Sequence, residues 1–168
     1  MHTTPEIETY LAVQVKRIRG LWRICLCLPM AYLFVCAAVN YYYFIPRSQI
    51  GIYPLSQSTY ELAFFSGLIV ALGIEAAIFM LRRDTKAYLV ARAHSPRELI
   101  ESYRWRFFIM AALCDTVSFI GVILFLLNGT LKAVFIFGLL ALICYAQIHP
   151  STRLARAALE EITPPRQP

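Results

Sequence analysis

Four long apolar runs limit this chain to one kind of architecture. The runs cover residues 24–44, 62–81, 107–127 and 131–148. Each is close to the ~20 helical residues that cross the ~30 Å hydrocarbon core of a bilayer. Only a helix satisfies all its backbone hydrogen bonds within one segment in lipid. The sequence therefore predicts an all-α integral membrane protein, with a single membrane domain over residues 1–168 that forms a bundle of four transmembrane helices.

The composition supports this class of protein. Hydrophobic residues make up 59% of the 168 residues and charged residues only 15%, which is too little polar surface to cover a soluble globule of this size. We therefore expect the lipid bilayer to be the main partner of the chain.

The basic residues predict the orientation of the bundle. Of the 16 Lys and Arg residues, all but Arg47 and Lys132 lie in residues 1–23, 82–106 and 149–168. Because basic segments stay on the cytoplasmic side, both termini and a loop at 82–106 are predicted to be cytoplasmic, in a bacterial inner membrane. A short amphipathic cytoplasmic helix is expected near residues 152–162.

The chain carries no motif for a cofactor or for catalysis. The seven glycines form no phosphate-binding pattern, so we expect no nucleotide, and topology explains the net charge of +6 without nucleic acid. The His and Cys residues lack metal-ligand spacing. The sequence therefore predicts no enzyme activity, no metal and no cofactor.

Two carboxylates inside the apolar runs are the strongest clue to function. Glu75 and Asp115 belong to consecutive runs, and a charge at bilayer depth costs at least ~2.5 kcal/mol, so each acid needs a partner or a proton. Glu75 lies seven residues before Arg82 and Asp115 nine residues after Arg106, which places both ~10–14 Å from the cytoplasmic boundary. We expect antiparallel neighbours to bring the two acids to one level.

Small and hydroxyl-bearing residues surround both acids. Close helix packing in lipid favours small residues at spacings of three and four. The predicted packing stripe consists of Ala63, Gly67, Ala71, Ala111 and Ala112, and the hydroxyl groups beside Asp115 belong to Thr116 and Ser118. These residues lead to the hypothesis that Glu75 and Asp115, with both hydroxyls, form one proton-binding or monovalent-cation-binding site.

A second interpretation needs no ion. A neutral carboxyl group can hydrogen-bond a neighbouring helix, with an average contribution of ~0.6 kcal/mol. The chain would then be an accessory or scaffolding subunit of a larger membrane complex, in which the acids only pair helices. An ion-binding chain would instead work in a homo-oligomer or beside a larger complex.

Residues 91–127 resemble the carboxylate-bearing hairpin of the rotary ATP synthase c subunit. The similarity rests on the loop Ala91-Arg-Ala-His-Ser-Pro96 and on the helix from Arg104 through apolar and small residues to Asp115. This resemblance implies that Asp115 carries an ion and that Thr116 is its hydroxyl partner.

The chain is also similar to small, uncharacterised bacterial four-helix integral membrane proteins. The similarity rests on Ala111-Ala-Leu followed by an acid, on Leu126-Leu-Asn-Gly129 before a fourth apolar run, and on His149-Pro-Ser-Thr-Arg-Leu154 after it. It implies the four-helix architecture and no particular activity.

Overall fold

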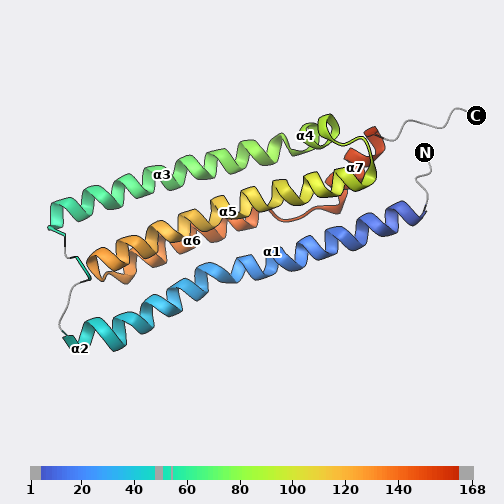
Figure 1. Ribbon diagram of the computed structural model, residues 1–168. Helices are drawn as coiled ribbons and strands as arrows, with labels where there is room; N and C mark the ends of the chain where they lie inside the picture. The colour runs from blue at the N-terminus through green and yellow to red at the C-terminus, as the bar shows by residue number, and fades with distance from the viewer. Residues whose placement is uncertain (1–4, 48–50, 54, 163–168) are drawn as a thin grey trace, which may run out of the picture.

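The computed structural model describes residues 5–47, 51–53 and 55–162, and every regular element within these ranges is a helix (Figure 1). The elements are α1 (Pro5–Val39), the π-helical turn η1 (Asn40–Phe44), α2 (Ile45–Arg47), α3 (Gln57–Arg83), α4 (Thr85–Arg92), α5 (Pro96–Asn128), α6 (Leu131–Gln147) and α7 (Thr152–Ile162). The predicted all-α class is confirmed, and α7 covers the expected amphipathic segment.

Four helices run along one long axis, with α5 and α6 at the centre (Figure 1). The contact between α5 and α6 is the most extensive in the bundle, and α1 and α3 each pack against both of these helices. In Figure 1, α1 and α3 lie on opposite sides of the α5–α6 pair. The central pair therefore connects two outer helices that lie apart from each other.

Three helices are long and apolar enough to cross a membrane, which confirms the coarse prediction. They are α1 with η1, then α3 and α5. Their surfaces expose large apolar side chains such as Phe34, Leu62 and Ile69, at 72%, 69% and 71% exposure, which is the pattern of side chains that face lipid. The fourth run forms α6, which has only 17 residues and bends by 42° into α7.

The segment predicted as a loop at 82–106 is mostly helical. It contains the end of α3, all of α4 and the first turns of α5. The start of α5 has clear local causes: Pro96 occupies the first turn, and Ser95 Oγ accepts a hydrogen bond from the Glu98 N–H at 3.3 Å. Glu98 Oε2 in turn accepts from the His94 N–H at 2.8 Å, so side chains satisfy N–H groups that the helix leaves unpaired.

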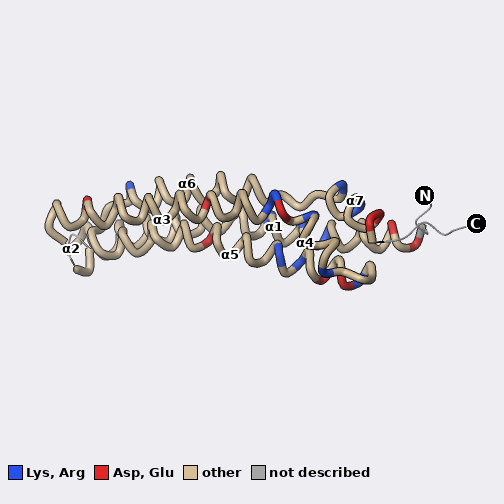
Figure 2. The backbone as a smooth tube through the Cα atoms, turned by 90° about the horizontal axis from the view of Figure 1, so that it is seen from above, with Lys and Arg blue, Asp and Glu red and all other residues tan. Residues whose placement is uncertain are grey.

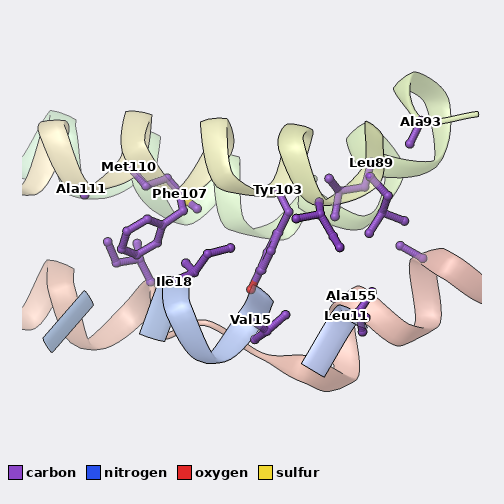
Figure 3. Close-up of a cluster of buried hydrophobic side chains, with 14 of the residues drawn as sticks. Leu11, Val15, Ile18, Leu89, Ala93, Tyr103, Phe107, Met110, Ala111 and Ala155 are labelled. Atoms are coloured by element: carbon purple, nitrogen blue, oxygen red, sulfur yellow. The ribbon is translucent and has the colours of Figure 1, made fainter. Parts of the chain in front are cut away.

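We call residues 5–23, 82–106 and 149–162 the basic end, because most Lys and Arg residues gather there (Figure 2). This end has an apolar core of its own, shown in Figure 3, where side chains of α1, α4, α5 and α7 meet. Val15 and Leu89 are fully buried in this core and Tyr103 is 6% exposed. A few apolar residues at helical spacing among the charged residues therefore pack together. They form a helical cap at one end of the bundle.

A left-handed glycine ends α5. Gly129 has a φ of 67° and its N–H donates to the Phe125 carbonyl at 2.6 Å, as at many helix C-termini. The turn lets α6 start at Leu131 and pack back along α5.

Candidate functional site

Asp115 lies on the side of α5 that meets α1. Its Oδ2 accepts a hydrogen bond from the Tyr32 hydroxyl of α1 at 3.2 Å. Its Oδ1 is buried and has no hydrogen-bond partner within the described part of the chain. The Tyr32 ring also contacts Phe119 edge to face, with 5.4 Å between ring centroids. The acid therefore connects α5 to α1 through one oxygen and leaves the other without a donor.

Glu75 makes a different contact on the other side of the central pair. Its Oε1 accepts a hydrogen bond from Gln147 Nε2 at 3.0 Å. Gln147 is the last residue of α6, so Glu75 lies at the level where this helix ends. This acid connects α3 to α6.

The two acids have separate partners. Neither oxygen of Asp115 bonds to Glu75, because Oδ2 accepts from Tyr32 and Oδ1 has no partner among the described residues. The rotation of each helix about its own axis explains this separation. Glu75 of α3 faces α6, whereas Asp115 lies at the edge of α5 next to α1. Each acid therefore bonds to a different residue of another helix, and the shared proton-binding or cation-binding site of Glu75 and Asp115 stays a prediction.

The two hydroxyl groups expected beside Asp115 are used differently. Thr116 is exposed, and its Oγ1 donates to the Ala112 carbonyl of its own helix at 2.9 Å. Ser118 is 2% exposed and its Oγ makes no hydrogen bond within the described ranges. Neither hydroxyl bonds to the carboxylate. Among the described residues, no group of three or more His, Cys, Asp or Glu side chains is arranged to hold a metal ion.

The small stripe of α3 does face the central pair. A Cβ atom built on Gly67 would lie 2.8 Å from Ile120 Cγ2 of α5 and 3.2 Å from Phe137 Cζ of α6. Ala71 is buried and Ala63 is half-buried in the same cluster. The missing side chain at Gly67 therefore allows α3 to fit between α5 and α6.

The two alanines of the expected stripe of α5 lie in different surroundings. Ala111 is 6% exposed and belongs to the core of the basic end, but Ala112 is exposed on the outer surface. Two neighbouring helix positions point about 100° apart, and the packing face of α5 includes Ala111 with its other neighbour Met110, which is 5% exposed.

The polar contacts at the C-terminal end of α6 were not predicted. Trp22 Nε1 donates to the Tyr145 carbonyl at 2.8 Å, and an Arg19 guanidinium nitrogen lies 3.4 Å from the Pro150 carbonyl oxygen. The Ser151 N–H donates to Tyr103 Oη at 3.0 Å. The Tyr145 carbonyl belongs to the last turn of α6, whose carbonyls lack partners within the helix, whereas Pro150 and Ser151 lie in the segment between α6 and α7. The only sequence signal was the presence of Trp22 and Arg19 at the expected membrane boundary.

These contacts define a class of protein: an all-helical chain whose apolar helices are suited to a membrane and whose buried polar groups connect one helix to another. No protein-family model, curated protein or solved structure compared with the chain matches it. The two resemblances drawn from sequence motifs therefore stay predictions.

Proposed function

We propose that this chain is a non-catalytic accessory or scaffolding protein of the bacterial inner membrane. In this proposal α1, α3, α5 and α6 all span the bilayer, and the basic end faces the cytoplasm with both termini. The observation that carries the proposal is the separate pairing of the two intramembrane acids: Asp115 with Tyr32, and Glu75 with Gln147.

The energetics of these contacts fit a structural role. Each hydrogen bond joins an outer helix to the central pair, α1 to α5 in one case and α3 to α6 in the other. Interhelical hydrogen bonds in membranes contribute ~0.6 kcal/mol on average, up to ~1.7 kcal/mol. Two such contacts fix the rotation of α1 and α3 and thereby decide which of their faces meet lipid or a partner protein.

Amide and apolar replacements of the acids test this role. Asp115→Asn and Glu75→Gln keep an oxygen that accepts the same hydrogen bond, whereas Asp115→Leu and Glu75→Leu remove it. For a scaffold, we expect the amide variants to unfold in an SDS titration near the wild-type midpoint and to keep co-purifying proteins. The leucine variants should lose ~0.6–1.7 kcal/mol of stability at each site. Asp84→Asn, an exposed acid at the end of α3, is the control.

A second candidate function is proton binding at Asp115. The observation that favours it is the buried, unpartnered Oδ1, because a carboxyl group without a donor in an apolar environment is more stable when it holds a proton. An infrared spectrum should then show a protonated carboxyl band that Asp115→Asn removes and Glu75→Gln keeps. Wild-type protein without that band, or with a band insensitive to Asp115→Asn, would exclude this function.

Mass analysis of the protein in mild detergent tests the partner. A stable complex with another protein supports the accessory role, and a closed oligomer of this chain supports the ion-handling one. A monomer without partners contradicts the accessory role and leaves proton binding at Asp115 to the infrared test.

A further inference from the structure

A groove opens between α1 and α5 at the basic end. It encloses ≈ 460 Å³, and three arginine side chains line it: Arg17 from α1, and Arg97 and Arg104 from α5. Glu101 is the acidic residue of the lining, so the groove has a net charge of +2. Such a concentration of guanidinium groups in one hollow suits an anion.

Most of this positive charge is available to a ligand. Arg97 forms an exposed ion pair with Glu101 at 3.4 Å, which contributes little in water. Arg17 and Arg104 form no ion pair with any residue that the structure describes. Tyr10 and Gln14, also in the lining, add a hydroxyl and an amide that can donate hydrogen bonds.

The end of the groove at Leu21 and Arg104 lies at the depth of lipid headgroups, and Arg17 lies about one turn of α1 further from the apolar run. Arg104 is three residues before the apolar run 107–127, and Leu21, which also lines the groove, is three residues before the run 24–44. Three helical residues span ~4.5 Å, and the headgroup layer extends ~5–8 Å beyond the hydrocarbon core. Leu21, 38% exposed, adds an apolar side chain to the lining at the end of the groove nearest the apolar run of α1.

We propose that this groove binds the phosphate of an anionic phospholipid in the inner leaflet, with Arg17 and Arg104 as its principal ligands. The inference rests on the proposed placement of the basic end at the cytoplasmic face. It does not depend on the role of the two acids. A guanidinium group can pair with two phosphate oxygens at once. Basic pockets beside membrane helices bind anionic lipid headgroups.

Native mass spectrometry of the full chain in mild detergent tests the proposal. The probes are phosphatidylglycerol and phosphatidylcholine with identical acyl chains. We expect phosphatidylglycerol adducts on the wild-type protein and an affinity about 30-fold lower in the double variant Arg17→Gln, Arg104→Gln, since each arginine near the surface contributes about a factor of five to six. Glu101→Gln should strengthen binding because it removes the opposing charge.

A matched variant separates a site from general attraction. Arg82→Gln with Arg83→Gln removes the same charge from exposed positions in the last turn of α3 and should leave the affinity within twofold. Equal losses in both double variants would overturn the proposal. So would equal binding of phosphatidylcholine, or displacement of the lipid by equimolar inorganic phosphate, which would identify a site for a soluble anion. An unchanged SDS midpoint in both double variants shows that the fold persists. A loss of lipid binding then bears on the groove alone, and the scaffold role is tested separately by the variants of the two acids.

Discussion

Gly121 lies at the closest approach of α5 and α6. A Cβ atom at this position would lie 2.9 Å from Phe137 Cβ, 3.0 Å from the Ala133 carbonyl oxygen and 3.1 Å from Val134 Cα. These are backbone or backbone-proximal atoms, so no side-chain rotation relieves the contact. Gly121→Ala must therefore push the two central helices apart.

The size of the effect follows from two opposing terms. Forcing extra atoms into a packed core costs ~1–3 kcal/mol, and replacing glycine with alanine inside a helix gains ~1 kcal/mol. Gly73→Ala is the matched control, because a Cβ at Gly73 meets no atom within 4 Å. Since both variants gain the same helix propensity, their difference in unfolding free energy measures the clash, and we expect Gly121→Ala to be less stable than Gly73→Ala by ~1–3 kcal/mol.

An SDS titration in mixed micelles, followed by far-ultraviolet circular dichroism, measures this difference. The two variants should show the same helical content before unfolding and separate midpoints. If Gly121→Ala unfolds at the same SDS fraction as Gly73→Ala, the close approach of α5 and α6 is wrong.

Three further predictions use the same titration. Trp22→Phe leaves the Tyr145 carbonyl without the donor that lies at 2.8 Å and should cost ~1–3 kcal/mol; an unchanged midpoint would mean that water replaces the indole. Gly51→Ala forces a side chain onto a residue with φ of 76° and against the backbone of the α5 end, and we expect a loss of at least ~1 kcal/mol, whereas a stable variant would contradict the turn geometry. Lys86→Ala removes an ion pair with Glu161 whose side chains are 46% and 49% exposed, so it should change stability by less than ~1 kcal/mol, and a larger loss would show that this pair holds α7 in place.

The lengths of the apolar runs predicted the long helices well. A run near 20 residues has one solution in lipid, and α1 with η1, α3 and α5 contain the predicted residues. The helical cap was missed because its apolar residues form only short runs between charges, such as residues 87–91 around Leu89 and the pair Leu99–Ile100. The burial of Leu89 and Leu99 at 0% exposure comes from contacts between segments far apart in the sequence, which no local pattern contains.

The partners of the acids could not be predicted from depth alone. Residue counting gives the height of Glu75 and Asp115 along their helices, but a hydrogen bond also requires the rotation of each helix about its axis. That rotation depends on packing features such as Gly67 and Gly121. A usable signal was present in the partner Tyr32, which carries the only hydroxyl group within residues 24–39 and so needs an acceptor.

The shortness of α6 has a consequence for the surrounding lipid. As a span, its 17 residues would cover ~25 Å, less than the ~30 Å of an average hydrocarbon core. Its outward side chains Phe135, Leu139 and Ile143 are 60%, 51% and 44% exposed, so lipid tails beside α6 would have to shorten or disorder to match them. This hydrophobic mismatch would thin the bilayer on one side of the molecule only. The protein would then favour thin membranes and neighbouring proteins that lie in the same thinned lipid.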